Sequence, residues 1–416
     1  MQAGARQEWR NYWTLPIAGA LGNSLTVLLV YSLGLFMEPL TKEFGWNRAE
    51  ISFGITVTNF TALGLGLLCG MLVDRFGPRR IGILGVALLC ASVALLGTAT
   101  GSLTNWYLLW AFIAIGSAGV GPFIWTSAVA SRFDAGRGLA IGVVVAGSGL
   151  AATVIPPLTA WLLLHHGWRG GFIGLGATFA VVVIPVLILF FRGAYDGRVR
   201  PTKAEAKSIN AAMPGLSLKE GLRSAPFYQI GLAGGAFSFV AIGLIVHFVP
   251  ILRSSGLDLT AAAGITGTIG LASLAGRFGM GYLLDKFDAR PIAATAFALP
   301  AVAAGLLLSG GGTLSLTLAA LIVGFSLGSE LSIAFYLATR YFGLKAYGVL
   351  MSAMLSFLAI GMALGPLTAG YIFDRTNSYV NFLWLTIPLV LIASVLMATL
   401  RPVPDQSAAA GGQGGD

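Results

Sequence analysis

Twelve apolar runs, each long enough to cross a membrane as a helix, restrict the fold of this chain more than any other feature. A helix needs about 20 mostly apolar residues to cross the hydrocarbon core of a bilayer. The runs cover residues 13–37, 51–73, 81–100, 104–130, 139–164, 168–191, 226–252, 260–284, 291–309, 314–339, 346–371 and 379–399. We therefore expect an all-α membrane protein with twelve transmembrane helices.

The composition excludes the main alternatives. Hydrophobic residues make up 56% of the chain and charged residues only 10%, whereas soluble proteins average about 25% charged residues. The net charge of +9 comes from short basic clusters between the apolar runs, so it does not indicate nucleic-acid binding. Cys69 and Cys90 both fall inside apolar runs, which argues against a disulfide framework or a metal cluster. We expect no cofactor and no metal.

The distribution of basic residues predicts the orientation in the membrane. If the N-terminus is cytoplasmic, nineteen of the 25 Lys and Arg residues lie in cytoplasmic segments. This bias predicts that both termini and the central connection face the cytoplasm, in a cell (inner) membrane. The first apolar run is far longer than the apolar part of a signal peptide, so we expect it to stay as the first helix.

An internal repeat divides the chain into two halves of six helices. The segment from Gly70 to Phe76 resembles the segment from Gly281 to Phe287, about 210 residues later, and Pro157 matches Pro366 at nearly the same spacing. The expected units are an N-terminal six-helix bundle (1–191), a cytoplasmic central loop (192–225), a C-terminal six-helix bundle (226–400) and a flexible tail (401–416).

The segment from Gly70 to Arg80, GMLVDRFGPRR, resembles the signature loop between the second and third helices of the major facilitator superfamily. The resemblance implies the major facilitator fold and a conformational latch at the ends of two helices. The alternative is a plain basic cluster that only sets topology. The latch residues are Gly70, Asp74 and Arg75 in the first half and Gly281, Asp285 and Lys286 in the second.

Three further stretches resemble the monocarboxylate transporter family and its bacterial oxalate/formate-antiporter-like relatives. They are SRFDAGRGLAIG from Ser131, GWRG from Gly167, and RYFGLKAYG from Arg340. Together with the signature loop, these stretches extend the resemblance over nearly the whole chain. It implies a carrier of small organic acids.

Arg277 is the basic residue that lies well inside an apolar run, and the equivalent position in the first half is Gly66. A buried arginine is costly and usually faces a cavity or a partner. The alternative is an arginine that extends to the lipid headgroups. The family resemblance implies that Arg277 binds the substrate carboxylate, to which a guanidinium offers two parallel donors. Animal members of the family carry an aspartate where this chain has Ser273 and a lysine in the first helix, where this chain has none, so their proton coupling cannot be transferred.

Other polar and aromatic residues inside the runs are weaker candidates. Glu330 needs a partner or a proton, so it either pairs with Arg277, titrates during transport or is held by bonds between helices. We interpret His247 as an interfacial residue near the outer rim rather than a proton relay. Asn23, Asn59 and Ser148 fit either bonds between helices or a cavity wall. The aromatic candidates for the cavity wall, each of which packing explains as well, are Tyr31, Phe123, Trp125, Tyr336 and Phe357.

The sequence thus predicts a secondary transporter of small organic anions, such as monocarboxylates or oxalate-like acids, that works as a monomer by alternating access. Uniport, proton symport and exchange stay open. The alternatives are an exporter of neutral or cationic molecules and a membrane sensor without turnover. We expect no direct use of ATP, because the chain has no Walker A motif, and no enzyme, because it has no recognisable catalytic set.

Overall fold

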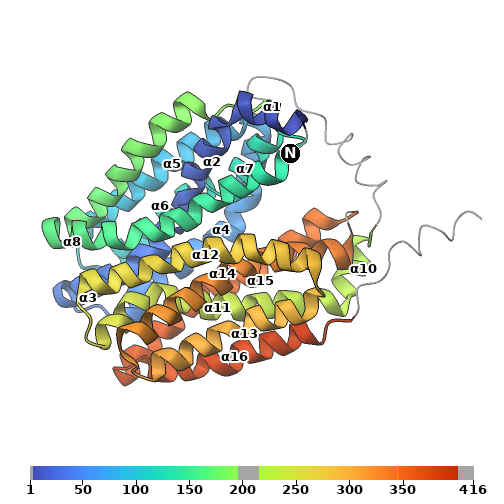
Figure 1. The fold of residues 1–416 in the computed structure, drawn as a ribbon. Coiled ribbons are helices and arrows are strands. Elements are labelled where there is room, and N and C mark those ends of the chain that lie inside the picture. Colours follow the sequence, from blue (N-terminus) through green and yellow to red (C-terminus); the bar gives the residue numbers. More distant parts are fainter. Residues whose placement is uncertain (1–2, 195–214, 344, 402–416) are drawn as a thin grey trace, which may run out of the picture.

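The computed structural model describes residues 3–194, 215–343 and 345–401, apart from the side chains of a few of them. Within this part of the chain the regular structure is helical, and it falls into two bundles that occupy separate halves of the molecule (Figure 1). The helices of the N-terminal bundle are α1 (Ala3–Tyr12), α2 (Thr14–Ser24), α3 (Leu28–Phe44), α4 (Arg48–Phe76), α5 (Pro78–Leu95), α6 (Leu103–Ala118), α7 (Pro122–Ala130) and α8 (Arg137–Phe190). Those of the C-terminal half are α10 (Leu218–Arg223), α11 (Ala225–Ser254), α12 (Leu259–Lys286), α13 (Ala289–Leu308), α14 (Gly312–Phe342), α15 (Tyr347–Thr376) and α16 (Val380–Ala398).

The number of membrane spans depends on how broken helices are counted. Within the described residues, ten helical segments are long and apolar enough to cross a membrane, and α4, which bends by 40°, makes an eleventh. The 54 residues of α8 contain a break at Gly167, where φ is 66° and ψ is −178°. At about 1.5 Å per residue, α8 is more than twice as long as a bilayer core is thick. Glycine adopts this backbone conformation readily, so the chain can turn back at Gly167. Counted as two spans, α8 brings the total to the twelve spans that the sequence predicts.

Two other expected helices are also interrupted. The first consists of α2 and α3, joined by a 3-10 turn at Leu25–Val27, and the fourth consists of α6 and α7, which meet at Gly119–Gly121 before Pro122. Proline at the first position of a helix fits the start of α7, since its missing N–H would have no partner there anyway. The short helix α10 lies inside the expected central loop, whose residues 195–214 lie outside the described part of the chain. Almost all of the expected tail does as well.

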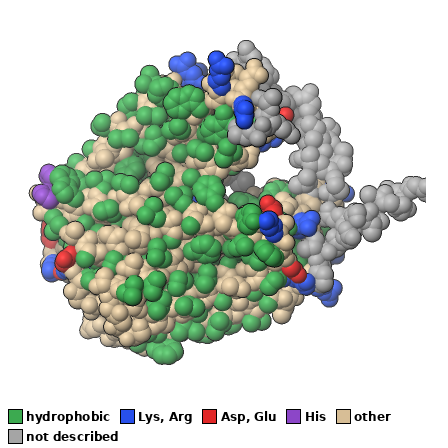
Figure 2. Space-filling model, in the orientation of Figure 1, with side chains coloured by type: hydrophobic (Ala, Val, Ile, Leu, Met, Phe, Trp, Pro, Cys, Tyr) green, Lys and Arg blue, Asp and Glu red, His purple; other side chains and the backbone are tan. Residues whose placement is uncertain are grey.

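The surface between the ends of the bundles is apolar, as lipid contact requires. Large hydrophobic side chains are exposed along the helices, and Val181 and Leu314 are more than 70% exposed. Figure 2 shows hydrophobic side chains spread over this face, with charged ones near its two edges. An integral membrane protein needs such a belt, because lipid chains replace water around its middle.

We call the end that carries α1, α10 and Arg401 the terminal end, and the other end the distal end (Figure 1). Among the described residues, the main contacts between the two bundles are those of α3 with α11, α4 with α15 and α8 with α12. Their backbones approach closely in the distal half. A Cβ atom on Gly270 of α12 would lie 2.4 Å from the backbone N of Thr153 in α8, and one on Gly370 of α15 would lie 2.7 Å from the backbone N of Ala49 in α4.

The same helices separate towards the terminal end. A Cβ atom on Gly66 in α4, Gly138 in α8, Gly281 in α12 or Gly348 in α15 would have no neighbouring atom within 4 Å. The ribbons likewise lie close together at the left of Figure 1 and spread apart at the right. The structure is therefore closed at the distal end and open between the bundles at the terminal end.

Candidate functional site

The site is built at the point where α8 and α12 begin to separate. On the distal side of this point, a Cβ atom on Gly149 would lie 2.5 Å from the side chain of Leu274. About two turns towards the terminal end, Gly142 comes near only Phe278, at 3.9 Å for an added Cβ atom. Glycine at these positions allows the helices to touch without side chains between them. Arg277 lies between the closed and the open part of this seam.

Arg277 bridges the two bundles. Its Nη1 donates to the backbone oxygen of Val145 at 2.8 Å and to Oγ of Ser148 at 3.0 Å, both in α8. Ser148 in turn donates to the same Val145 oxygen at 2.9 Å. The guanidinium therefore contacts both the Val145 carbonyl and the hydroxyl that donates to the same carbonyl, which places Arg277 against α8.

The rest of the guanidinium has no protein partner in the described residues. Arg277 is half-buried, and within that part of the chain it makes no ion pair and its Nη2 and Nε make no hydrogen bond. Tyr31 of α3 is buried and close enough to interact electrostatically with Arg277. The arrangement leaves an unpaired cation at the inner end of the opening, with two donor atoms available to an anion.

Glu330 lies elsewhere, inside the C-terminal bundle. Its side chain is 1% exposed, and its Oε1 accepts a hydrogen bond of 2.5 Å from Oγ of Ser238 in α11. The pairing with Arg277 that the sequence left open is absent from this structure, because the guanidinium faces α8 while the carboxyl faces α11. The carboxyl is thus available for a proton but does not neutralise the arginine.

The aromatic residues expected to line a cavity have different surroundings. Trp125 is fully buried in the N-terminal bundle, where its ring lies against Gly22 and Gly82 and its Nε1 donates to the Val120 oxygen at 2.8 Å. This packing corrects its assignment to a cavity wall, because its ring fills the space that two glycines leave.

The other aromatic candidates divide between packing and exposure. Phe357 is half-buried against Gly231 and Phe227 within the C-terminal bundle, which also favours packing. Phe123 is 42% exposed at the start of α7. Tyr336 is half-buried, with the guanidinium of Arg340 5.7 Å from its ring centre. Within the described residues, Tyr31 is the member of this set that lies close enough to Arg277 to interact with it electrostatically.

The expected latch residues lie on the open parts of α4 and α12. Gly70 and Gly281 have free space beside them, and Asp285 is exposed. Arg75 is exposed beside the ring of Phe76, and Lys286 donates to the Tyr282 hydroxyl at 2.5 Å. The side chain of Asp74 lies outside the described part of the chain. A latch between these helix ends therefore stays a prediction for a state in which the terminal end is closed.

The sequence interpretation of His247 is wrong. Its side chain is 0% exposed, and its ring contacts Ser52 of α4, the Pro366 oxygen of α15 and the hydroxyl of Tyr379, which precedes α16. The sequence placed it at the correct end of the helix but could not show that four helices converge there. We call Arg48, Ser52, His247, Asp374 and Tyr379 the polar clasp.

Sequence reasoning missed the remainder of the polar clasp. Asp374 of α15 accepts from the first backbone N–H groups of α4, at 2.9 Å from Arg48 and 2.8 Å from Ala49. Arg48 donates to the Tyr379 hydroxyl and stacks 3.5 Å above the ring of Phe373. The one available signal was that Arg48 and Asp374 both lie at helix ends on the same predicted side of the membrane.

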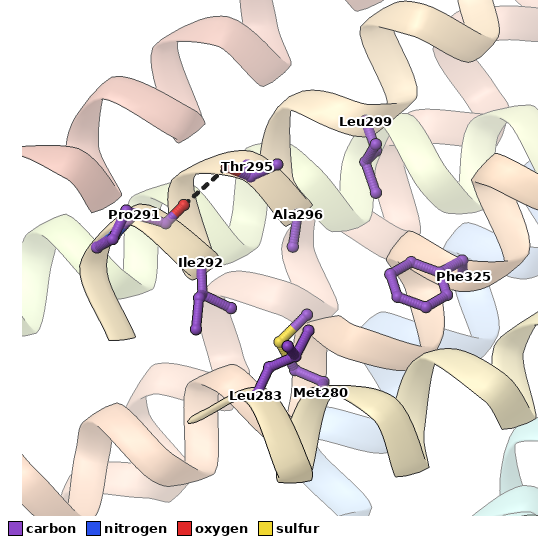
Figure 3. A pocket seen from close by; sticks show the side chains of 8 residues that line it. All are labelled: Met280, Leu283, Pro291, Ile292, Thr295, Ala296, Leu299 and Phe325. Carbon is purple, nitrogen blue, oxygen red and sulfur yellow. Dashed lines mark hydrogen bonds between the residues drawn. The ribbon is translucent and has the colours of Figure 1, made fainter. Parts of the chain in front are cut away.

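A separate apolar cavity of about 270 Å³ lies between α12, α13 and α14 (Figure 3). Its lining residues are Met280, Leu283, Pro291, Ile292, Thr295, Ala296, Leu299 and Phe325. The one hydroxyl among them, on Thr295, already donates to the Pro291 oxygen at 2.8 Å. The cavity has no charge for a polar solute, so Arg277 is the better candidate for solute binding. The described residues also contain no group of three or more metal-ligating side chains.

Comparisons with known proteins agree with this architecture. A family model described as Major Facilitator Superfamily matches residues 19–366 and 269–415. Monocarboxylate transporter 13 of Bos taurus is 27% identical over 401 residues, which are 93% of this chain and 89% of the relative. The oxalate:formate antiporter of Oxalobacter formigenes is 28% identical over 269 residues, which are 61% of this chain and 60% of the relative.

Solved structures resemble the fold over almost its full length. An inward-facing, occupied bacterial homologue of the human lysosomal transporter Spinster matches with a TM-score of 0.72 and 19% identity, over 94% of this chain and 96% of its own. A D-xylose–proton symporter matches with a TM-score of 0.71 and 14% identity, over 94% and 98%. The family match over both halves and the shared fold show that this chain is a multi-pass membrane transporter of the major facilitator superfamily.

Proposed function

We propose that this transporter carries small organic anions, monocarboxylates or oxalate-like acids, and that Arg277 binds their carboxylate. The observation that carries the proposal is the half-buried guanidinium, which lies at the inner end of the opening. Two of its nitrogen atoms have no partner among the described residues. Desolvating a cation is costly, and a carboxylate compensates for that cost through two parallel charge-assisted hydrogen bonds.

The position of Arg277 also fits alternating access. It contacts one bundle from the other, at the point where the two halves separate, and major facilitator halves are thought to rock about such a central site. With the predicted topology, the terminal end is cytoplasmic and the structure is open to the inside. We further propose that the protein works as a monomer in the cell (inner) membrane, with Gly70, Asp74, Arg75, Gly281, Asp285 and Lys286 as its inner latch.

The names of the relatives support the same class of substrate, since both a monocarboxylate transporter and an oxalate:formate antiporter are similar to this chain. An exporter of neutral or cationic molecules is less well supported, because Arg277 is not neutralised by Glu330 and would repel a cation. A sensor without turnover would bind a ligand but produce no flux.

Counterflow in proteoliposomes tests the proposal directly. Vesicles are loaded with one unlabelled compound from a panel of short mono- and dicarboxylates, and the same compound is offered outside in labelled form. Carboxylates should give uptake of the label, and amines of the same size should give none. Uptake of amines or neutral solutes alone would replace the anion assignment, and binding without flux for every compound would favour the sensor.

We propose Glu330 as the proton-coupling group, because an intramembrane carboxyl with one hydrogen-bond donor can exchange a proton without breaking an ion pair. Glu330→Gln should flatten the pH dependence of net uptake and spare exchange, in which the protein cycles with substrate bound. An unchanged pH profile of net uptake would remove Glu330 from the mechanism and leave the carboxylate site untouched.

A further inference from the structure

The polar clasp connects the two bundles at the distal end. Arg48 and Ser52 belong to α4 in the N-terminal bundle, whereas His247, Asp374 and Tyr379 belong to the C-terminal half. Glu38 of α3 and Arg253 of α11 add an exposed ion pair of 3.0 Å across the same end. The distal end can open only if these contacts break.

Hydrogen-bond directions in the polar clasp define the state of His247. Its Nε2 lies 2.9 Å from the Pro366 oxygen, which can only accept, so Nε2 carries a hydrogen. Its Nδ1 lies 2.8 Å from the Tyr379 hydroxyl. The Tyr379 oxygen already accepts from Arg48, so its own hydrogen is free to be donated to Nδ1. When the imidazole is neutral, both of its nitrogens, the Tyr379 hydroxyl and the Arg48 donor to it are paired, and Ser52 Oγ can accept from Nε2 at 3.2 Å.

A proton on Nδ1 disrupts this order. The imidazolium and Arg48 would then both donate to the single Tyr379 oxygen, and the Tyr379 hydrogen would lose its acceptor. Two cations would also share one phenol in a buried place, where charges repel more strongly than in water. Arg48 belongs to the opposite bundle, so the repulsion acts across the closed contact.

The carboxylates near His247 make their hydrogen bonds to other groups. From α4 it faces Arg48, and from the connection before α16 it faces the neutral Tyr379. Asp374 of α15 is occupied by the N-terminus of α4, and Glu38 of α3 pairs with Lys42 and with Arg253, which lies on the same helix as His247. Within the described residues, no carboxylate pairs with His247.

We propose that His247 is a proton-binding site that keeps the distal end closed when it is neutral and releases it when it is charged. This inference goes beyond carboxylate binding, and only its meaning for the transport cycle rests on the proposed function. With the distal end outside the cell, an acidic exterior would favour the outward-open state, and the proton would be taken up from the outside.

Distances between spin labels test the proposal without any substrate. Thr104 and Thr313 are exposed at the distal ends of the N-terminal and C-terminal bundles. The pair Thr104→Cys and Thr313→Cys, with Cys69→Ala and Cys90→Ala, would carry the labels in the full reconstituted chain. As the pH falls from about 7.5 to about 5, the range in which histidine titrates, the population with a longer distance between the labels should increase. One coupled proton raises the open-to-closed ratio by up to about tenfold per pH unit.

The decisive variant is His247→Gln, because the glutamine amide can donate and accept hydrogen bonds but cannot take up a proton between about pH 7.5 and about pH 5. Its distances should not respond to pH. His165→Gln is the matched control, because His165 is exposed at the distal end of the first span of α8 and should leave the response unchanged. A wild-type chain without a pH response, or a full response in His247→Gln, overturns the proposal.

A second variant keeps the test valid if His247→Gln does not fold. Tyr379→Phe removes both the acceptor for Arg48 and the donor to Nδ1. It should raise the open-to-closed ratio at neutral pH and weaken its dependence on pH, while an unchanged ratio and pH response contradict the proposal. None of these measurements uses a carboxylate substrate. A failure of the proposed anion transport can therefore be told apart from a failure of the proposed role of His247.

Discussion

The α8–α12 pair and the α4–α15 pair join the same two bundles, but they use different chemistry. Along α8 and α12 the distal contact is made by small residues such as Gly149 and Gly270, and the first charged contact is Arg277, where the helices separate. Along α4 and α15 charged side chains make the distal contact. Asp374 of α15 accepts a hydrogen bond from the N-terminus of α4, and Arg48 of α4 donates to the Tyr379 hydroxyl.

The comparison teaches that equivalent helix pairs in a repeat can take separate tasks. Arg277 corresponds to Gly66 of α4, which has open space beside it. A cation that stands where the helices diverge is available to a solute, whereas charges at the closed end are consumed by the protein itself. We therefore expect mutations in the first pair to change solute binding and mutations in the second to change the balance between open and closed states.

The largest effect should come from Arg277→Gln. Each charge-assisted hydrogen bond to a carboxylate contributes about 1.5–3 kcal/mol, and about 1.4 kcal/mol corresponds to one decade in affinity. Affinity for carboxylates, measured by binding or by the concentration dependence of counterflow, should fall at least about tenfold. Arg277→Lys should also bind poorly, because lysine keeps the charge but loses the planar fork.

Protein levels in the membrane should stay near normal in both variants, since removing a charge makes α12 more apolar. Arg169→Gln is a suitable control, because Arg169 pairs with Glu43 inside the N-terminal bundle and is remote from the opening. Wild-type carboxylate affinity in Arg277→Gln would show that the helix pair containing Arg277 does not bind the substrate.

A smaller effect is expected from Asp374→Asn in the other helix pair. The carboxylate accepts two backbone hydrogen bonds at a helix N-terminus, where a negative charge contributes up to about 2 kcal/mol in a partly buried position. Its loss should lower the closed-to-open ratio by about tenfold, as reported by the spin-label pair at Thr104 and Thr313. Carboxylate binding to the inward-open state should be retained.

Asp258→Asn provides the matched control for this change. Asp258 also caps a helix, α12, through an N–H at 2.8 Å, but it caps the helix to which it is attached. Its substitution should leave the distances unchanged. An equal opening in both variants would mean that general loss of helix capping, rather than loss of a link between the bundles, moves the equilibrium.

Much of the fold follows from the sequence, because a bilayer permits few structures. Twelve apolar runs, the positions of Lys and Arg and the repeat around Gly70 and Gly281 predict the helices and their division into halves. Arg277 also stands out in sequence, since a charge inside an apolar run needs a reason. Its partners Val145 and Ser148 do not, because nothing in an apolar run tells which of its faces meets another helix.

The polar clasp shows the same limit more strongly. Ser52, His247 and Tyr379 are separated by more than a hundred residues along the chain, and each alone resembles an ordinary residue near a helix end. Trp125 illustrates the opposite error, since a large aromatic residue in an apolar run is equally suited to a cavity wall and to a core. Only the glycines opposite its ring, Gly22 and Gly82, assign it to the core.

The smallest effect should come from Glu8→Gln, which examines a second remote carboxylate at a helix N-terminus. Glu8 of α1 accepts from the backbone N–H groups of Asp134, Ala135 and Gly136 before α8, at 2.9–3.1 Å. These contacts, with that from Gly136 the largest, hold the pKa of Glu8 below its usual range. A carboxyl with a lowered pKa stabilises the structure above its unfolded pKa and loses this contribution as the pH falls.

Glu8 and α8 belong to the same bundle, unlike Asp374 and α4. Glu8→Gln should therefore lower the protection factors of the α1 amides against hydrogen exchange at neutral pH to those that the wild type shows in acid, without moving the spin-label distances. A change in those distances would mean that α1 takes part in opening the molecule, and that a carboxylate cap within one bundle can control the contact between the two.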